Sequence, residues 1–167
     1  NFKIDKERST ITAAAGLSFE NILRKIVPAG FFLPVSPGTR NVTVGGAIAS
    51  DVHGKNHHVD GSFGNHVKRL LLIDSKGELR DLNSSEESSY EDKALFLNTI
   101  GGMGLTGIIV EATFVTVSED EIDTDVPLIL IDAVPAKLGF ATVPCIVGQL
   151  LHQGSLPTNT HVPLVFL

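Results

Sequence analysis

The glycine pair Gly45 and Gly46, followed by mostly small side chains, has the clearest chemical potential in this sequence. Residues 41–44 precede the pair, and their β-branched side chains predict a strand. A glycine amide can approach a bulky or charged ligand because no Cβ stands in the way. Consecutive exposed amides form a concavity that binds anions such as a pyrophosphate. The alternative is a tight turn with close strand–helix packing, and the glycines alone favour neither interpretation.

A polar segment, residues 53–66, combines Lys55 with the histidines His53, His57, His58 and His66. Imidazoles bind metal ions, but no carboxylate completes a familiar ligand spacing here. The glycine at position 54 and the loop-like composition argue against a helix face shared by the first two histidines. We therefore expect these side chains to line a polar pocket or to lie on the surface, and we expect no metal site.

A second glycine segment, residues 101–107, contains the spacing G-x-G-x-x-G from Gly102 to Gly107. A dinucleotide site of the Rossmann type requires a strand before this motif and a helix after it. Here residues 92–98 predict a helix before the motif, and residues 108–117 predict a strand after it. The inverted order excludes a Rossmann site. The segment is either a second contact to a cofactor or a helix-to-strand turn.

The elements that must position these loops are predicted by apolar periodicity. Residues 19–27 place apolar side chains on one helix face, with Ser18 at the cap and Pro28 and Gly30 at the end. Residues 9–15 predict a strand, and residues 70–82 predict a hairpin that turns at positions 75–77. Helices alternate with hairpins rather than with single parallel strands, so the predicted fold class is α+β.

Composition narrows the possible partners. The 167 residues carry a formal net charge of −6 and contain no run of Lys or Arg, which argues against nucleic acid and against an electrostatic membrane anchor. The single cysteine, Cys145, excludes an internal disulfide. The longest apolar region, residues 138–151, is shorter than the roughly 18 residues that cross a bilayer. We expect no transmembrane segment, and no signal-like stretch is visible.

Several blocks together resemble one family of FAD-linked oxidases, those with the vanillyl-alcohol-oxidase (PCMH-type) flavin domain, and in particular its decaprenylphosphoryl-β-D-ribose 2′-oxidase branch. The blocks specific to this branch are HGKNHH at residues 53–58 and GSFGNHV at residues 61–67. TVGGAIA at residues 43–49 is shared more widely with sugar-lactone and alditol oxidases. The resemblance covers residues 2–117, and it divides the chain into a partial FAD-binding domain, residues 1–117, and a tail, residues 118–167, with no match.

The resemblance implies a non-covalently bound FAD. Its cofactor contacts correspond to Gly38, Thr43, Val44, Gly45, Gly46, Ser50, Asp51, Val52, His53 and Ile109. His53 and Lys55 would lie beside the flavin ring and the sugar, as a positioning group and an electrostatic contact.

The implied reaction oxidises the 2′-hydroxyl of a polyprenylphosphoryl ribose by hydride transfer to flavin N5. A partner short-chain reductase would complete the epimerisation used in cell-wall arabinan synthesis. The implied location is cytoplasmic or peripheral at the inner membrane.

The chain departs from the family's pattern at both ends. We find neither the first flavin loop, of the Gly-Arg-Ser-Tyr-Gly kind, nor the large substrate domain, so the PCMH-type domain is partial and weak or absent FAD binding is expected. Other hypotheses remain open: an aldonolactone or alditol oxidase, a non-catalytic remnant of the flavin fold, and a histidine-based metalloprotein.

Overall fold

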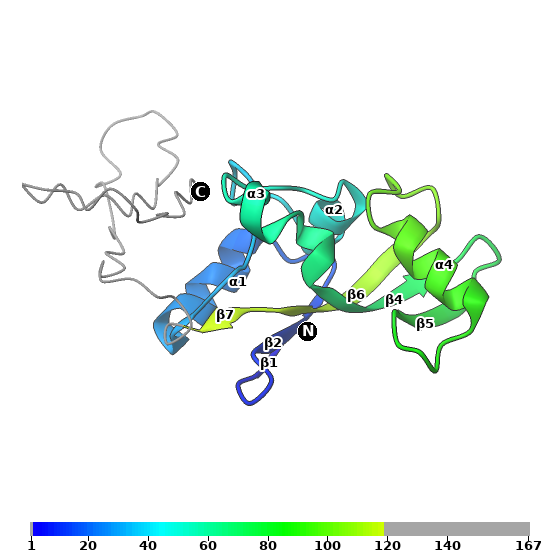
Figure 1. The fold of residues 1–167 in the computed structure, drawn as a ribbon, viewed down its shortest axis with the longest axis horizontal. Coiled ribbons are helices and arrows are strands. Elements are labelled where there is room, and N and C mark those ends of the chain that lie inside the picture. The colour runs from blue at the N-terminus through cyan, green and yellow to red at the C-terminus, as the bar shows by residue number, and fades with distance from the viewer. Residues whose placement is uncertain (1, 119–167) are drawn as a thin grey trace, which may run out of the picture.

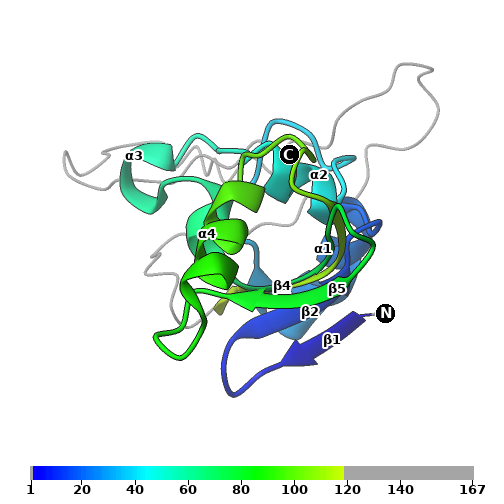
Figure 2. The same ribbon diagram turned by 90° about the vertical axis from the view of Figure 1, so that its right-hand side faces the viewer.

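The computed structural model describes residues 2–118, in which helices lie on one face of a curved antiparallel sheet (Figures 1 and 2). The sheet has the order β1-β2-β6-β4-β5, and β3 pairs with β7 separately. The strands are β1 (Phe2–Asp5), β2 (Thr10–Ala14), β3 (Phe31–Phe32), β4 (Val67–Ile73), β5 (Leu79–Asn83), β6 (Ile108–Val115) and β7 (Val117–Ser118). The helices are α1 (Phe19–Ile26), α2 (Val44–Ala49), α3 (His57–Asp60) and α4 (Tyr90–Thr99), with 3₁₀ turns at Val27–Ala29 and Phe63–His66. The α+β class is confirmed.

Helix α1 forms as its periodicity predicts. Phe19, Ile22 and Ile26 are fully buried, so one face of the helix packs on the sheet. The Ser18 hydroxyl accepts a hydrogen bond from the amide of Asn21 at 3.2 Å and caps the first turn. The helix ends in a 3₁₀ turn, after which Gly30 takes a left-handed conformation, with φ 79°.

The core lies between the helices and the inner face of the sheet. Alternate residues of β2 and β6 point inward, and Ile11 pairs with Phe114 in the register. Aromatic rings join the layers: the Phe63 ring lies 5.1 Å from that of Phe19 and 5.2 Å from that of Phe114. These contacts fix α1 against β6 through the segment that follows the histidine-rich loop.

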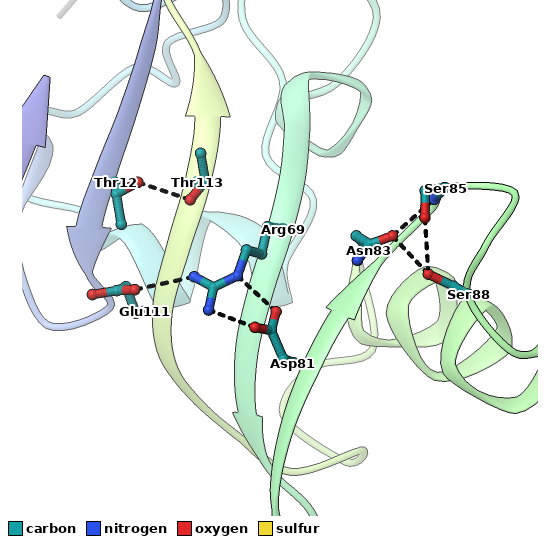
Figure 3. Close-up of polar contacts among 8 residues, drawn as sticks. All are labelled: Thr12, Arg69, Asp81, Asn83, Ser85, Ser88, Glu111 and Thr113. Atoms are coloured by element: carbon teal, nitrogen blue, oxygen red, sulfur yellow. Dashed lines mark hydrogen bonds and ion pairs between the residues drawn. The ribbon is translucent and has the colours of Figure 1, made fainter. Parts of the chain in front are cut away.

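The outer face of the sheet is polar and internally paired (Figure 3). The Arg69 guanidinium donates to both carboxylate oxygens of Asp81, at 2.6 and 2.7 Å, and to Glu111 at 3.2 Å. The hydroxyls of Thr12 and Thr113 lie 2.9 Å apart across β2 and β6. Paired side chains of this kind match a sheet with one face packed and one face in water.

The structure corrects one predicted element that bears on the glycine pair. The strand predicted at residues 41–44 does not form: Thr43 makes an isolated bridge to Ser18, and Val44 begins α2. The hydroxyl of Thr43 caps this helix, and helical packing of the apolar residues that follow overrides their β propensity.

The other differences are smaller. The last strand breaks at Thr116, whose amide donates to the carbonyl of Ser9 at 2.7 Å, so β7 is separate from β6. Strand β1 and helix α3 were not predicted from the sequence. The tail assigned from residue 118 onward lies outside the described residues except for Ser118. The domain boundary therefore stays a prediction.

Candidate functional site

The first turn of α2 uses its own amides inside the protein. The amide of Val44 donates to the Leu17 carbonyl at 2.9 Å, and that of Gly45 donates to the Ala15 carbonyl at 2.8 Å. The amide of Gly46 donates to the Thr43 hydroxyl at 3.1 Å. These three amide hydrogens are used within the protein, which favours close packing over a pyrophosphate concavity at residues 43–46.

Close packing, the alternative interpretation of the glycine pair, is what the structure shows. A Cβ on Gly45 would stand 3.0 Å from the Cβ of Ala15, tighter than ordinary packing allows. The start of α1 is closed in the same way, because the amides of Phe19 and Glu20 donate to the carbonyls of Val42 and Arg40. The starts of α1 and α2 therefore use these amides within the protein and do not offer them to a phosphate.

One flank of α2 is exposed. Thr43, Gly46 and Ser50 are exposed at positions i, i+3 and i+7, which lie on one side of a helix. Two of these side chains are small and polar, and the middle residue has none. A flat strip of this kind fits a planar or extended group laid along the helix. Val44 is fully buried, so its predicted cofactor contact has no geometric support.

The segment after α2 leads into a closed loop. The amide of Phe63 donates to the Val52 carbonyl at 2.8 Å, and His53 bridges to Ser62 in antiparallel fashion. The amide of Gly64 donates to Oδ1 of Asp51 at 2.9 Å. Residues 54–61, which we call the histidine loop, therefore leave and return at one place. His53 stands at its base and Lys55 within it.

The imidazoles of the loop gather on the surface. The His53 ring lies 5.1 Å from the His57 ring, and the rings of His57 and His58 lie 3.9 Å apart. Nδ1 of His57 is 3.0 Å from the carbonyl of Gly54, while Nε2 of His66 is 3.0 Å from that of Asp60. Among residues 2–118, no three His, Cys, Asp or Glu side chains meet in a way that could hold a metal ion.

The loop rests on the segment before residue 37. Gly54 is buried, and a Cβ there would stand 2.6 Å from the Ser36 carbonyl oxygen. The Asn56 side chain donates to the carbonyl of Pro34 at 2.8 Å and to the carboxylate of Asp60 at 2.7 Å. The loop therefore has a packed underside, while His53 and Lys55 remain exposed above it.

The second glycine segment is a helix-to-strand turn that closes the end of α2. The amide of Gly101 donates to the carbonyl of Ile48 at 2.9 Å, and that of Met103 donates to the carbonyl of Ala49 at 2.8 Å. Helix α4 precedes the segment and β6 follows it, which confirms the exclusion of a Rossmann site. Gly104 is exposed and has open space around it, and the second contact to a cofactor stays a prediction.

Most of the predicted site residues lie along one path, from the flank of α2 to the histidine loop. Gly38 and Ile109 come from other elements: Gly38 lies in an exposed connection with open space around it, and Ile109 pairs with Leu72 near the start of β6. The sequence reasoning missed Gly64 as the partner of Asp51. The repeated glycines of the block at residues 61–64 were the available signal.

The comparisons with known proteins identify the class. Residues 1–83 match the family model described as FAD binding domain. The described chain is therefore a partial FAD-binding domain of mixed helix and sheet, and FAD is the cofactor of this domain. Within residues 2–118, the exposed α2 flank fits such a group along its length, whereas the amides at the helix starts do not fit its diphosphate.

The relatives are named as oxidases or dehydrogenases, apart from one without an assigned activity. The chain is 48% identical over 110 residues to "Decaprenylphosphoryl-beta-D-ribose oxidase" of Mycolicibacterium smegmatis, covering 66% of this chain and 23% of that protein. It is 37% identical over 97 residues to an uncharacterized protein of Streptomyces coelicolor, covering 58% of this chain and 24% of that protein. It is 33% identical over 72 residues to "L-gulonolactone oxidase 3" of Arabidopsis thaliana, covering 42% of this chain and 12% of that protein. The chain thus spans about a quarter or less of these relatives.

Proposed function

We propose that this chain is the part of an FAD-dependent oxidoreductase that lies along the flavin and oxidises a sugar hydroxyl, the 2′-hydroxyl of a polyprenylphosphoryl ribose. The observation that carries the proposal is the 48% identity to the ribose oxidase, which extends over 110 residues. The geometry supports it because the exposed flank of α2 runs directly into the loop that holds His53 and Lys55.

The residues of this chain have separate tasks in the proposed reaction. When bound, FAD would supply the acceptor for the hydride that leaves the carbinol carbon, while the hydroxyl group loses its proton. Thr43, Gly46 and Ser50 provide the low surface along which it lies. His53 holds the substrate hydroxyl by a hydrogen bond from the loop base. Lys55 offers positive charge to the substrate phosphate or to the flavin.

The finer assignments are those that the family resemblance implies. A polyprenyl phosphate tail would bring the protein to the periphery of the inner membrane, and a partner short-chain reductase would act on the keto sugar in cell-wall arabinan synthesis. No helix within residues 2–118 is both long and apolar enough to span a bilayer.

Two rival functions have observations behind them. The similarity to a gulonolactone oxidase favours a soluble lactone or alditol as substrate, although it covers fewer residues at lower identity. A non-catalytic remnant is favoured by the internal use of the amides at both helix starts, which leaves little of residues 2–118 to hold a diphosphate.

A chimera tests the proposal against both rivals. Residues 2–117 replace the matching segment of the M. smegmatis relative, and flavin content and oxidation of polyprenylphosphoryl ribose and of gulonolactone are measured. We expect a flavin-loaded chimera that oxidises the ribose and loses turnover on His53→Ala or Lys55→Ala. Oxidation of the lactone alone would favour the first rival. A folded, flavin-loaded chimera without turnover would contradict the proposal.

A further inference from the structure

The side chain of Asp51 is used within the protein at the base of the histidine loop. Its Oδ1 accepts the amide hydrogen of Gly64 at 2.9 Å, and the residue is only partly exposed. Asp51 lies two positions before His53, and Gly64 lies two positions after Ser62, the bridge partner of His53. The carboxylate therefore connects the two chain segments that precede and follow residues 53–62.

The backbone of Asp51 is held in an uncommon conformation. Its φ is 43°, in the left-handed region that Gly, Asn and Asp adopt more readily than other residues. Its amide donates to the Ile48 carbonyl at 3.0 Å, at the end of α2. The chain thus turns sharply at Asp51, from the flank of α2 to the base of the loop. Such strained positions persist where surrounding contacts fix them, often beside functional groups.

The surroundings leave room for this carboxylate and little else. A Cβ on Gly64 would stand 2.6 Å from Oδ1 of Asp51 and 2.2 Å from Ile100. On the other side, a Cβ on Gly101, whose φ is 72°, would stand 3.4 Å from the Cβ of Asp51. Gly64 therefore lies close against the carboxylate, and Gly101 is in ordinary contact distance of the same residue.

We propose that Asp51 is a positioning residue: its carboxylate, by accepting the Gly64 amide, fixes the histidine loop so that His53 and Lys55 are presented beside the flank of α2. The catalytic use of His53 and Lys55 rests on the proposed function, but their placement by Asp51 does not depend on flavin. It differs from the expectation that Asp51 contacts the cofactor.

Position 51 needs an oxygen that accepts the Gly64 amide and a residue that tolerates a positive φ. Substitutions in the full 167-residue chain can separate these two requirements. Asp51→Asn keeps both the oxygen acceptor and the tolerance of positive φ. Asp51→Gly keeps only the tolerance, and Asp51→Ala keeps neither. The matched control is Asp74→Ala, because Oδ1 of Asp74 also accepts backbone amides, from Lys76 and Glu78, in a remote hairpin turn.

The first readouts need no flavin. Hydrogen exchange of the Gly64 amide and the imidazole NMR signals of His53 and His57 are compared across the variants. We expect Asp51→Ala and Asp51→Gly to speed exchange at Gly64 by roughly tenfold and to shift both imidazoles. We expect Asp51→Asn to restore both, and Asp74→Ala to change neither. Should Asp51→Ala not fold, the comparison of Asp51→Gly with Asp51→Asn decides.

The proposal is overturned if Asp51→Gly leaves Gly64 exchange and the imidazole signals as they are, or if Asp51→Asn fails to restore them. In the chimera, kcat for Asp51→Gly should fall at unchanged flavin content and recover in Asp51→Asn. If both Asp51→Gly and Asp51→Asn lose flavin, the Asp51 carboxylate contacts the cofactor, and the positioning proposal is overturned. A chimera inactive with native Asp51 would count against the proposed function and leave the flavin-free result standing.

Discussion

The hydroxyl of Thr43 accepts a hydrogen bond from the amide of Gly46 at 3.1 Å, so the residue before the glycine pair caps the helix that contains it. The same helix is short and holds two glycines, which are poor helix formers. Its stability must therefore come from this cap and from burial of Val44, Ala47 and Ile48.

Removal of this cap should destabilise the fold. Thr43→Ala is expected to lower the free energy of unfolding by about 1 kcal/mol, because the Gly46 amide loses its acceptor. Thr43→Ser keeps the hydroxyl and should lose less than half of that. Urea unfolding of the full chain, followed by circular dichroism, measures both. Equal losses in the two variants would show that the threonine methyl group, rather than the cap, is responsible.

Substitution of the buried glycine in the histidine loop should be costly. Gly54→Ala places a methyl group 2.6 Å from the Ser36 carbonyl oxygen and 2.8 Å from Oδ1 of Asn56. We expect a loss of about 1–3 kcal/mol in unfolding free energy. Gly38→Ala is the matched control, since a Cβ there meets nothing within 4 Å. A neutral Gly54→Ala would mean that the loop does not rest on residue 36.

The hydroxyl of Ser36 is buried and has no hydrogen-bond partner among residues 2–118. A buried polar group without a partner lowers stability. Ser36→Ala should therefore raise the free energy of unfolding by about 1 kcal/mol. The exposed Ser50→Ala serves as the comparison and should be close to neutral. A loss of stability in Ser36→Ala would show that the hydroxyl has a partner in solution.

The start of α4 should make stability depend on acid pH. The Ser89 hydroxyl donates to the Asp92 carboxylate, and the Arg80 guanidinium donates to it as well; both lower the pKa of Asp92 below its usual 3.8. The folded protein thus keeps this group charged where the unfolded chain protonates. The resulting stabilisation is complete above the unfolded pKa and is lost as the pH falls through the folded pKa.

Asp92→Asn should therefore differ most from the native chain near neutral pH, and the difference should shrink from about pH 5 to about pH 2. Urea midpoints at each pH measure this. Glu87→Gln, at an exposed position in the preceding loop, is the control. A constant difference across the range would show that the charge of Asp92 does not contribute.

The chain by itself should bind FAD weakly. The amides at the starts of α1 and α2 are already used, so residues 2–118 hold little for the diphosphate. Titration of FAD into the 167-residue chain, followed by flavin fluorescence, should give a Kd weaker than about 10 μM. Separate titrations of riboflavin and ADP would show which half is held. A stoichiometric complex at lower concentration would contradict this prediction.

Much of the fold follows from local pattern. Helix α1 and the hairpin of β4 and β5 are confirmed because apolar spacing, a serine cap and a glycine turn all favour the same structure. The strand predicted at residues 41–44 was wrong. Its β-branched residues favoured a strand, whereas the cap at Thr43 and the apolar spacing of residues 44, 47 and 48 favoured a helix. The helical spacing was visible in the sequence, but it extends over only one turn.

The site was less accessible from the sequence. The glycine pair indicated close approach, but the partner that approaches is the backbone of residues 15–17 rather than a ligand. The link between Asp51 and Gly64 depends on tertiary contacts of two loops, which no local pattern encodes. The cofactor itself follows from the family resemblance and the matching family model, not from the glycine spacing.

The histidine loop is fixed at its base, where Asp51, Val52 and His53 meet residues 62–64, and on its underside, where Asn56 donates to the Pro34 carbonyl, while Val59 is 81% exposed. Extra residues inserted beside Val59 would interrupt α3, but the added length itself has a small entropic cost and the contacts at the base would stay in place. The histidine loop can thus differ in length while the scaffold that anchors it stays unchanged.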